Sequence, residues 1–170
     1  MSDQREQIVD GLKKAIETES DGYHFYTMAA GSIEDAKGCE TFERLAREEL
    51  EHMRFLERQL KSFKETGRAS PGAELGKPAG FEGENPIFSE QIKSRISEAH
   101  FEMSALSIAI QLELNSRSYY TKQSESAQDD EVKAFYGGLA DWESVHYHAL
   151  LRQQEALKED YWAAGGFAPF

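Results

Sequence analysis

Two short stretches of the sequence, "ELEH" and "ESVH", place a glutamate three residues before a histidine: Glu49 with His52, and Glu143 with His146. Residues three apart lie on the same face of a helix, so each pair could reach a common point. Carboxylate oxygens and imidazole nitrogens are ligands of divalent metal ions. One such pair alone is most simply a chance feature of a helix, so the metal hypothesis depends on its surroundings.

Around the first pair, apolar residues recur at helical spacing: Phe42, Leu45, Met53, Leu56 and Phe63. Glu49 and His52 follow this stripe and are predicted to point inward. A buried carboxylate without a partner is costly, so a compensating cation is expected. The neighbouring glutamates and the remaining histidines are expected to face solvent: Glu17, Glu48, Glu51, His24, His100 and His148.

The sequence also repeats itself at a shift of 94 residues, which takes Glu49 onto Glu143 and His52 onto His146. The same shift takes Glu19 onto Glu113 and Tyr26 onto Tyr120, with no gap. All four glutamates and both histidines fall on apolar stripes. Two hairpins related by approximate two-fold symmetry would bring these six side chains together.

Four carboxylates gathered in a dry core would repel one another and take up protons. Two divalent cations would neutralise their four charges and use the two imidazoles as further ligands. Mixed oxygen and nitrogen ligands without a thiolate favour iron or manganese, and zinc stays open. We therefore predict two metal ions per chain, iron first, held by Glu19, Glu49, His52, Glu113, Glu143 and His146. Tyr26 and Tyr120 are either core residues or hydrogen-bond partners of the ligand carboxylates.

The elements that must position these residues are four long helices, predicted at about 3–30, 40–64, from 89 onward, and from 131 onward. We expect one all-α domain over residues 1–160, with two helical hairpins joined by a long crossover at about 66–88. A crossover of this kind is typical of ferritin-like four-helix bundles. An aromatic tail at 161–170, with no regular structure assigned, is expected to dock on a bundle or dimer surface.

Composition narrows the environment and the partners. The chain has 170 residues and a net charge of −12, which argues against binding to nucleic acid or to anionic membranes. Cys39 is the only cysteine, so no internal disulfide can form. We found no apolar run suited to a signal peptide or a membrane span, and a cytoplasmic location is expected.

These segments together resemble the rubrerythrin branch of the ferritin-like di-iron carboxylate superfamily, over about residues 5–158. The stretch "AIETESDGYHFYTMAA" resembles the first metal helix of that family, and "EELEH" resembles its bridging glutamate and histidine. The stretches "QLELNSRSYY" and "DWESVH" supply the second set. The resemblance implies that Glu19 is a terminal ligand and that Glu49 and Glu143 bridge two irons.

Two departures from the family pattern bear on peroxide reduction. Typical rubrerythrins carry a rubredoxin-like domain with two CxxC pairs, which the single Cys39 cannot form. They also carry an extra glutamate one turn from the terminal ligand of the third helix, where this sequence has Ser116 and Arg117. Neither departure alters the six predicted ligands.

The resemblance implies a non-haem di-iron oxidoreductase, of peroxidase or ferroxidase type, that reacts with peroxide or oxygen. Electrons would come from a separate donor protein such as a rubredoxin, and a homodimer is expected. Two alternatives stay open. One is an iron-handling ferroxidase, and the other is a non-catalytic helical module stabilised by zinc or manganese.

Overall fold

The computed structural model describes residues 3–70, 75–76 and 86–165, and these residues form helices and connecting turns. The helices are α1 (Asp3–Ala30), α2 (Ala36–Thr66), α3 (Gln91–Ser94), the 3₁₀ helix η1 (Ile96–Glu98), α4 (His100–Ser126) and α5 (Asp130–Ala164). The all-α prediction is confirmed. No helix in the described ranges is long and apolar enough to cross a membrane.

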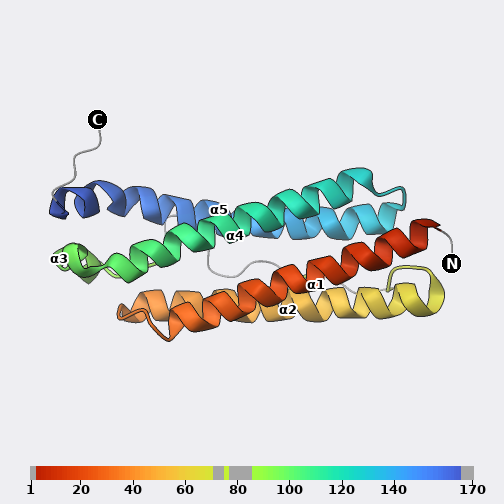
Figure 1. Cartoon of the computed structure of the whole chain (residues 1–170), viewed down its shortest axis with the longest axis horizontal. Coiled ribbons are helices and arrows are strands. Elements are labelled where there is room, and N and C mark those ends of the chain that lie inside the picture. The colour runs from red at the N-terminus through yellow and green to blue at the C-terminus, as the bar shows by residue number, and fades with distance from the viewer. Residues whose placement is uncertain (1–2, 71–74, 77–85, 166–170) are drawn as a thin grey trace.

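The four long helices form two antiparallel hairpins that lie side by side (Figure 1). Helix α1 packs along α2, α4 packs along α5, and α1 lies beside α4 between the hairpins. The two hairpins correspond to the two halves of the sequence repeat. Most of the predicted crossover, and the end of the aromatic tail, fall outside the described residues. The first part of that tail, Tyr161–Ala164, is the last turn of α5.

Side chains fix the helix ends. Asp35 caps α2 by accepting a hydrogen bond from the Gly38 backbone N–H, and Asp129 caps α5 in the same way. At the C-terminal end of α2, Gly67 adopts the left-handed conformation, with φ of 75°, and its N–H donates to the Phe63 carbonyl. These residues set where the helices carrying the two Glu–His pairs begin and end.

The third predicted helix does not start at Ser89 as one continuous rod. It is broken into α3, η1 and α4, because Arg95 and Ala99 have non-helical backbone angles. Ser89 does not cap this helix; its N–H and hydroxyl instead donate to the Asp35 carboxylate at the start of α2. The Arg95 guanidinium donates to Glu34 as well as to Glu102. These contacts tie the broken segment to the first hairpin.

The apolar core is divided into two clusters. One contains residues near the turn of the first hairpin, such as Phe42 and Leu45, together with Leu106 and Leu150 from the second. The other contains Leu12, Leu56 and Leu139 with their neighbours. Along each long helix, the residues of one cluster precede the predicted metal ligands and those of the other follow them. The ligands therefore lie midway along the bundle with apolar packing on both sides.

Candidate metal centre

Each of the four long helices contributes to a cluster of buried polar side chains in the middle of the bundle. α1 supplies Glu19 and α4 supplies Glu113, while α2 and α5 each supply one Glu–His pair. Their exposed fractions lie between 0% for the two histidines and 4% for Glu49. The structure thus brings together all six predicted residues: Glu19, Glu49, His52, Glu113, Glu143 and His146.

The ligand atoms fall into two overlapping groups. One group comprises Glu19, Glu49, His52 and Glu143; the other comprises Glu49, Glu113, Glu143 and His146. Within each group, one ligand atom from every residue lies within 4.8 Å of all the others. Glu49 and Glu143 belong to both groups, which is the position required of carboxylates that bridge two metal ions.

The histidines face the carboxylates through the Nδ1 atom. His52 Nδ1 lies 3.0 Å from Glu19 Oε2, 3.2 Å from Glu143 Oε1 and 3.5 Å from Glu49 Oε2. His146 Nδ1 lies 3.6 Å from Glu113 Oε1. In both halves the same ring nitrogen is directed at the cluster, and the Nε2 atom is left on the other side of the ring.

Two tyrosines connect the hairpins through the ligand carboxylates. The Tyr26 hydroxyl on α1 donates to Glu113 on α4, and the Tyr120 hydroxyl on α4 donates to Glu19 on α1. Both rings are fully buried, with exposed fractions of 1% and 0%. Each tyrosine therefore packs in the core and also donates a hydrogen bond to a carboxylate of the cluster.

The four glutamates divide into two kinds by their pKa values. Burial raises the pKa of Glu49 and Glu143 well above the usual range, and the charges of Glu19 and Glu113 act in the same direction. Burial also acts to raise the pKa of Glu19 and Glu113. Hydrogen bonds from their neighbours and the nearby histidines outweigh it, so both pKa values are lowered, that of Glu113 to about 2.

The pKa values of the two histidines are also shifted. Burial acts to lower their pKa values, but Glu19 beside His52 and Glu113 beside His146 raise them above the usual value. Without metal, these shifts favour the charged forms of Glu19, Glu113 and the two imidazoles, and the neutral forms of Glu49 and Glu143. Protons would then compensate the negative charge that divalent cations compensate when they are bound.

The donor set fits a pair of metal ions. One carboxylate oxygen of the cluster, Glu113 Oε2, is buried and has no hydrogen-bond partner among the described residues. An unpaired buried carboxylate oxygen is costly, and a cation would satisfy it. Four carboxylates and two imidazoles without a thiolate suit iron or manganese. The residues present are therefore compatible with the di-iron centre that the sequence predicts.

One buried carboxylate next to the cluster was not predicted from the sequence. Glu48 was predicted to face solvent, yet it is only 5% exposed. Its Oε2 accepts a hydrogen bond from Trp142 Nε1 at 2.9 Å and lies 2.7 Å from His146 Nε2. The prediction was wrong because the buried face of α2 is wide enough to include both positions of the pair Glu48–Glu49. The signal was available: Glu48 lies three residues after Leu45 and four before His52, both inward-facing.

The other residues set aside from the site are placed as predicted. Glu17, Glu51, His24, His100 and His148 are all exposed. Trp142 shields the site, since its ring packs edge-to-face against His52 with ring centroids 4.8 Å apart. One turn beyond Glu113, Ser116 faces inward and Arg117 is half-buried, so no extra carboxylate occupies that turn.

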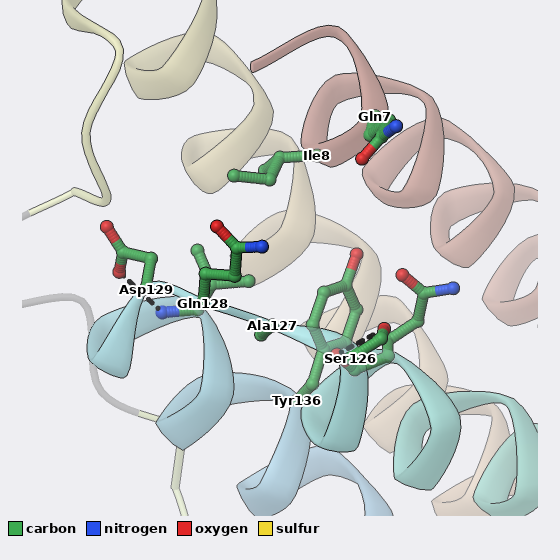
Figure 2. Close-up of a pocket in the computed structure, with 9 residues that line it drawn as sticks. Gln7, Ile8, Ser126, Ala127, Gln128, Asp129 and Tyr136 are labelled. Carbon is green, nitrogen blue, oxygen red and sulfur yellow. Dashed lines mark hydrogen bonds between the residues drawn. The ribbon is translucent and has the colours of Figure 1, made fainter. Parts of the chain in front are cut away.

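Two pockets lie at different distances from the cluster. A pocket of about 280 Å³ is lined by His52 and Trp142 together with the exposed Arg54 and Arg58. A second pocket, of about 230 Å³, lies at one end of the bundle. Figure 2 shows the Tyr136 hydroxyl in this second pocket, pointing toward the turn of α1 that carries Gln7 and Ile8. Only the first of these two pockets includes one of the six cluster residues.

Comparisons with known proteins agree with this geometry. The rubrerythrin family model matches residues 10–105, more than half of the chain. The matched segment includes Glu19, Glu49 and His52, and the second set of cluster residues lies beyond it. Searches among curated proteins and among solved structures found no match. On the family match, and with a helical bundle that buries two groups of glutamate and histidine ligands, the chain belongs to the rubrerythrin family.

Proposed function

We propose that this protein is a non-haem di-iron oxidoreductase that reduces peroxide or oxygen with electrons from a separate donor protein. The observation that carries the proposal is the pair of overlapping ligand groups, which share Glu49 and Glu143 and are buried between two apolar clusters. Family membership supports iron as the metal. When bound, two Fe(II) ions would supply one electron each, so that one peroxide and two protons yield two water molecules.

The chain's own residues would hold the centre and control its surroundings. Glu49 and Glu143 would join the two metal positions, while Glu19 and Glu113 would each complete one of them. The tyrosine hydroxyls that donate to Glu19 and Glu113 would keep those carboxylates oriented. The apolar clusters on both sides would limit the access of bulk water.

Space near the centre is consistent with a small oxidant. On α1, the position one turn beyond Glu19 is Gly22, where an added Cβ would lie 3.4 Å from the Glu49 carboxylate carbon. A larger side chain at this position would press on the shared carboxylate. The pocket beside His52 would give a small molecule a route toward the part of the cluster formed by that residue.

The reaction is tested by rapid mixing. Protein loaded anaerobically with two equivalents of Fe(II) should show a rise in near-ultraviolet absorbance from Fe(III) when mixed with hydrogen peroxide. One peroxide should be consumed for every two irons oxidised. A loaded protein whose iron stays Fe(II) over many seconds of mixing would refute the proposal. Continued uptake of iron far beyond two per chain would favour an iron-handling role instead.

The ligand assignment is tested by metal analysis of single variants. His52→Ala and His146→Ala should each weaken binding at one position, because each imidazole belongs to one ligand group. Glu49→Ala and Glu143→Ala should weaken both positions, since each carboxylate belongs to both groups. His148→Ala and Glu51→Ala are matched controls, because both side chains are exposed on the same helices. Two tightly bound metals in all four ligand variants would contradict the assignment.

The donor protein and the homodimer are further parts of the proposal. Electrons are expected from a partner because the sequence contains no cysteine pair that could carry its own redox centre. Titration with a small reduced redox protein would test the electron donor. The molecular mass in solution would test the homodimer.

A further inference from the structure

Glu48 is a buried carboxylate that belongs to neither ligand group. It lies on α2, one residue before the shared Glu49, and is 5% exposed. Its Oε2 contacts two groups of α5, Trp142 Nε1 at 2.9 Å and His146 Nε2 at 2.7 Å. Glu48 therefore spans the two hairpins from the outer side of the cluster.

The contact with His146 is made on the side of the ring away from the metal ligands. His146 Nδ1 is directed at Glu113, and Nε2 is directed at Glu48. An imidazole whose Nε2–H donates to a carboxylate keeps its Nδ1 lone pair available for a metal ion. Such a carboxylate also fixes the ring orientation and makes the ligand nitrogen more basic.

Among the described residues, the other half of the repeat has no matching contact behind its histidine. The 94-residue shift takes Glu48 onto Trp142, so the position that holds a carboxylate in the first half holds an indole in the second. His52 Nε2 is buried and has no hydrogen-bond partner in the described part of the chain. Against His52 lies the edge-to-face ring of Trp142, which offers no oxygen acceptor. The two halves of the repeat therefore have matching ligand residues. They differ in the group next to the histidine Nε2 atom, which is a carboxylate for His146 and an indole ring for His52.

We infer that Glu48 is a positioning residue for His146 and that it makes the two metal positions unequal. The inference rests on the proposed function, since it concerns the same metal centre. The position completed by His146 should bind its metal more tightly, because its imidazole is held in the metal-binding tautomer. The position completed by His52 should bind more weakly and fill second.

Manganese(II) is the probe, because the free ion has a strong EPR signal that disappears on binding. Titration of the metal-free protein should show two events of different affinity. Glu48→Leu, which removes the acceptor, should weaken the tighter event by about 10- to 100-fold, the range found when such partners are removed. The weaker event should change by less than about threefold. Glu48→Gln retains a similar volume and an acceptor oxygen, so its effect should be smaller. Glu51→Leu, on an exposed neighbour, should change neither event.

A double-mutant cycle separates positioning from a general structural role. The effect of Glu48→Leu should persist in a His52→Ala background and disappear in a His146→Ala background. If Glu48→Leu does not fold, the same cycle is made with Glu48→Gln. Equal weakening of both binding events, or an effect of Glu48→Leu that persists without His146, would overturn the inference about Glu48. Binding of two manganese ions by the wild type would in that case still support the two-metal centre of the proposed function. A wild type that binds fewer than two manganese ions would refute the two-metal centre and this inference with it.

Discussion

The cluster combines residues of similar type in different electrostatic states. The pKa values of Glu19 and Glu113 are lowered because hydrogen bonds and imidazoles surround them, whereas burial and neighbouring charges raise the pKa values of Glu49 and Glu143. The tyrosines contribute to this division. Each donates to one of the two carboxylates with a low pKa and to neither of the shared carboxylates. The two carboxylates with lowered pKa values are thus the ones that accept from a tyrosine hydroxyl.

Removing one tyrosine hydroxyl should therefore weaken both the fold and metal binding. Tyr120→Phe leaves the ring in its place against Tyr136 but deprives Glu19 of a buried donor. A buried acceptor that loses its partner costs about 1–3 kcal/mol, so the free energy of unfolding should fall by that amount. Metal affinity should fall by about tenfold or more. Urea unfolding and a metal titration check the two effects. Tyr119→Phe is the control, because its hydroxyl donates to the Gly11 carbonyl instead; equal loss of metal affinity in both variants would contradict the role given to Tyr120.

At the scale of elements, the sequence repeat predicted the hairpins and all six cluster residues. Glutamates on an apolar stripe are rare, and a second set of them at the same spacing in the other half of the sequence is rarer still. It could not predict the break between α3 and α4. Ile92, Ile96 and Ala99 keep inward spacing across the break, so periodicity alone reads them as one helix. The contacts that accompany the break, from Ser89 to Asp35 and from Arg95 to Glu34, join distant segments. Hydrophobic spacing carries no information about such pairings.

Asp35 caps α2 and also accepts hydrogen bonds from Ser89, just before α3. Because Asp35 is charged, these contacts depend on pH. Its Oδ1 accepts from Gly38 N at 2.8 Å and from Ser89 N at 3.0 Å. Burial acts to raise the pKa of Asp35, but the hydrogen bonds from Ser89 and Gly38, together with Arg95, lower it below 3.8. A lowered folded-state pKa stabilises the fold above the pKa of the unfolded chain. That contribution is lost as the pH falls through the folded value.

Asp35→Ala should reduce the free energy of unfolding at pH 7 by about 2 kcal/mol, the upper end of the range for a helix cap. The loss is large because the variant also removes the hydrogen bonds that Ser89 donates to Asp35. Asp129→Ala is the matched control, since Asp129 caps α5 through Glu131 and Val132 alone and should lose about 1 kcal/mol. Asp35→Asn keeps an acceptor oxygen, and its deficit against the wild type should shrink as the pH falls below 3.8. Urea unfolding at several pH values measures all three. Equal losses at both caps, or a deficit for Asp35→Asn independent of pH, would show that Asp35 acts only within α2.

At the scale of the whole molecule, the bundle accepts a polar layer in the middle of its core. The layer separates the two apolar clusters, and the ligand side chains of both hairpins meet in it. Such a layer is tolerated only while its charges are balanced, by metal ions or by protons. The stability of the whole bundle should therefore respond to whichever of the two is present.

We expect the metal-free protein to lose stability as the pH rises. The folded-state pKa values of Glu49, Glu143, His52 and His146 are raised, so each of these groups stabilises the fold below its unfolded pKa. That stabilisation is lost as the pH rises through the folded value. For the two histidines the loss begins above 6.5, the ordinary pKa. Bound metal should reverse the trend, because it replaces these protons and stabilises only the folded state.

The measurement is the melting temperature with and without Fe(II) or Mn(II), from about pH 6 to pH 8.5, a range that starts near the ordinary histidine pKa and extends above it. The gap between metal-bound and metal-free protein should widen as the pH rises, since metal competes with fewer protons and the metal-free carboxyl groups begin to ionise. Replacing Glu19 and Glu113 together with glutamine removes two of the four carboxylates and should make the metal-free melting temperature less dependent on pH. The same replacement at Glu17 and Glu125, exposed on the same two helices, should leave the pH dependence unchanged. A metal-free protein as stable as the loaded one at pH 8, and unaffected by the Glu19 and Glu113 replacements, would mean that the six side chains do not share one charge-balanced site.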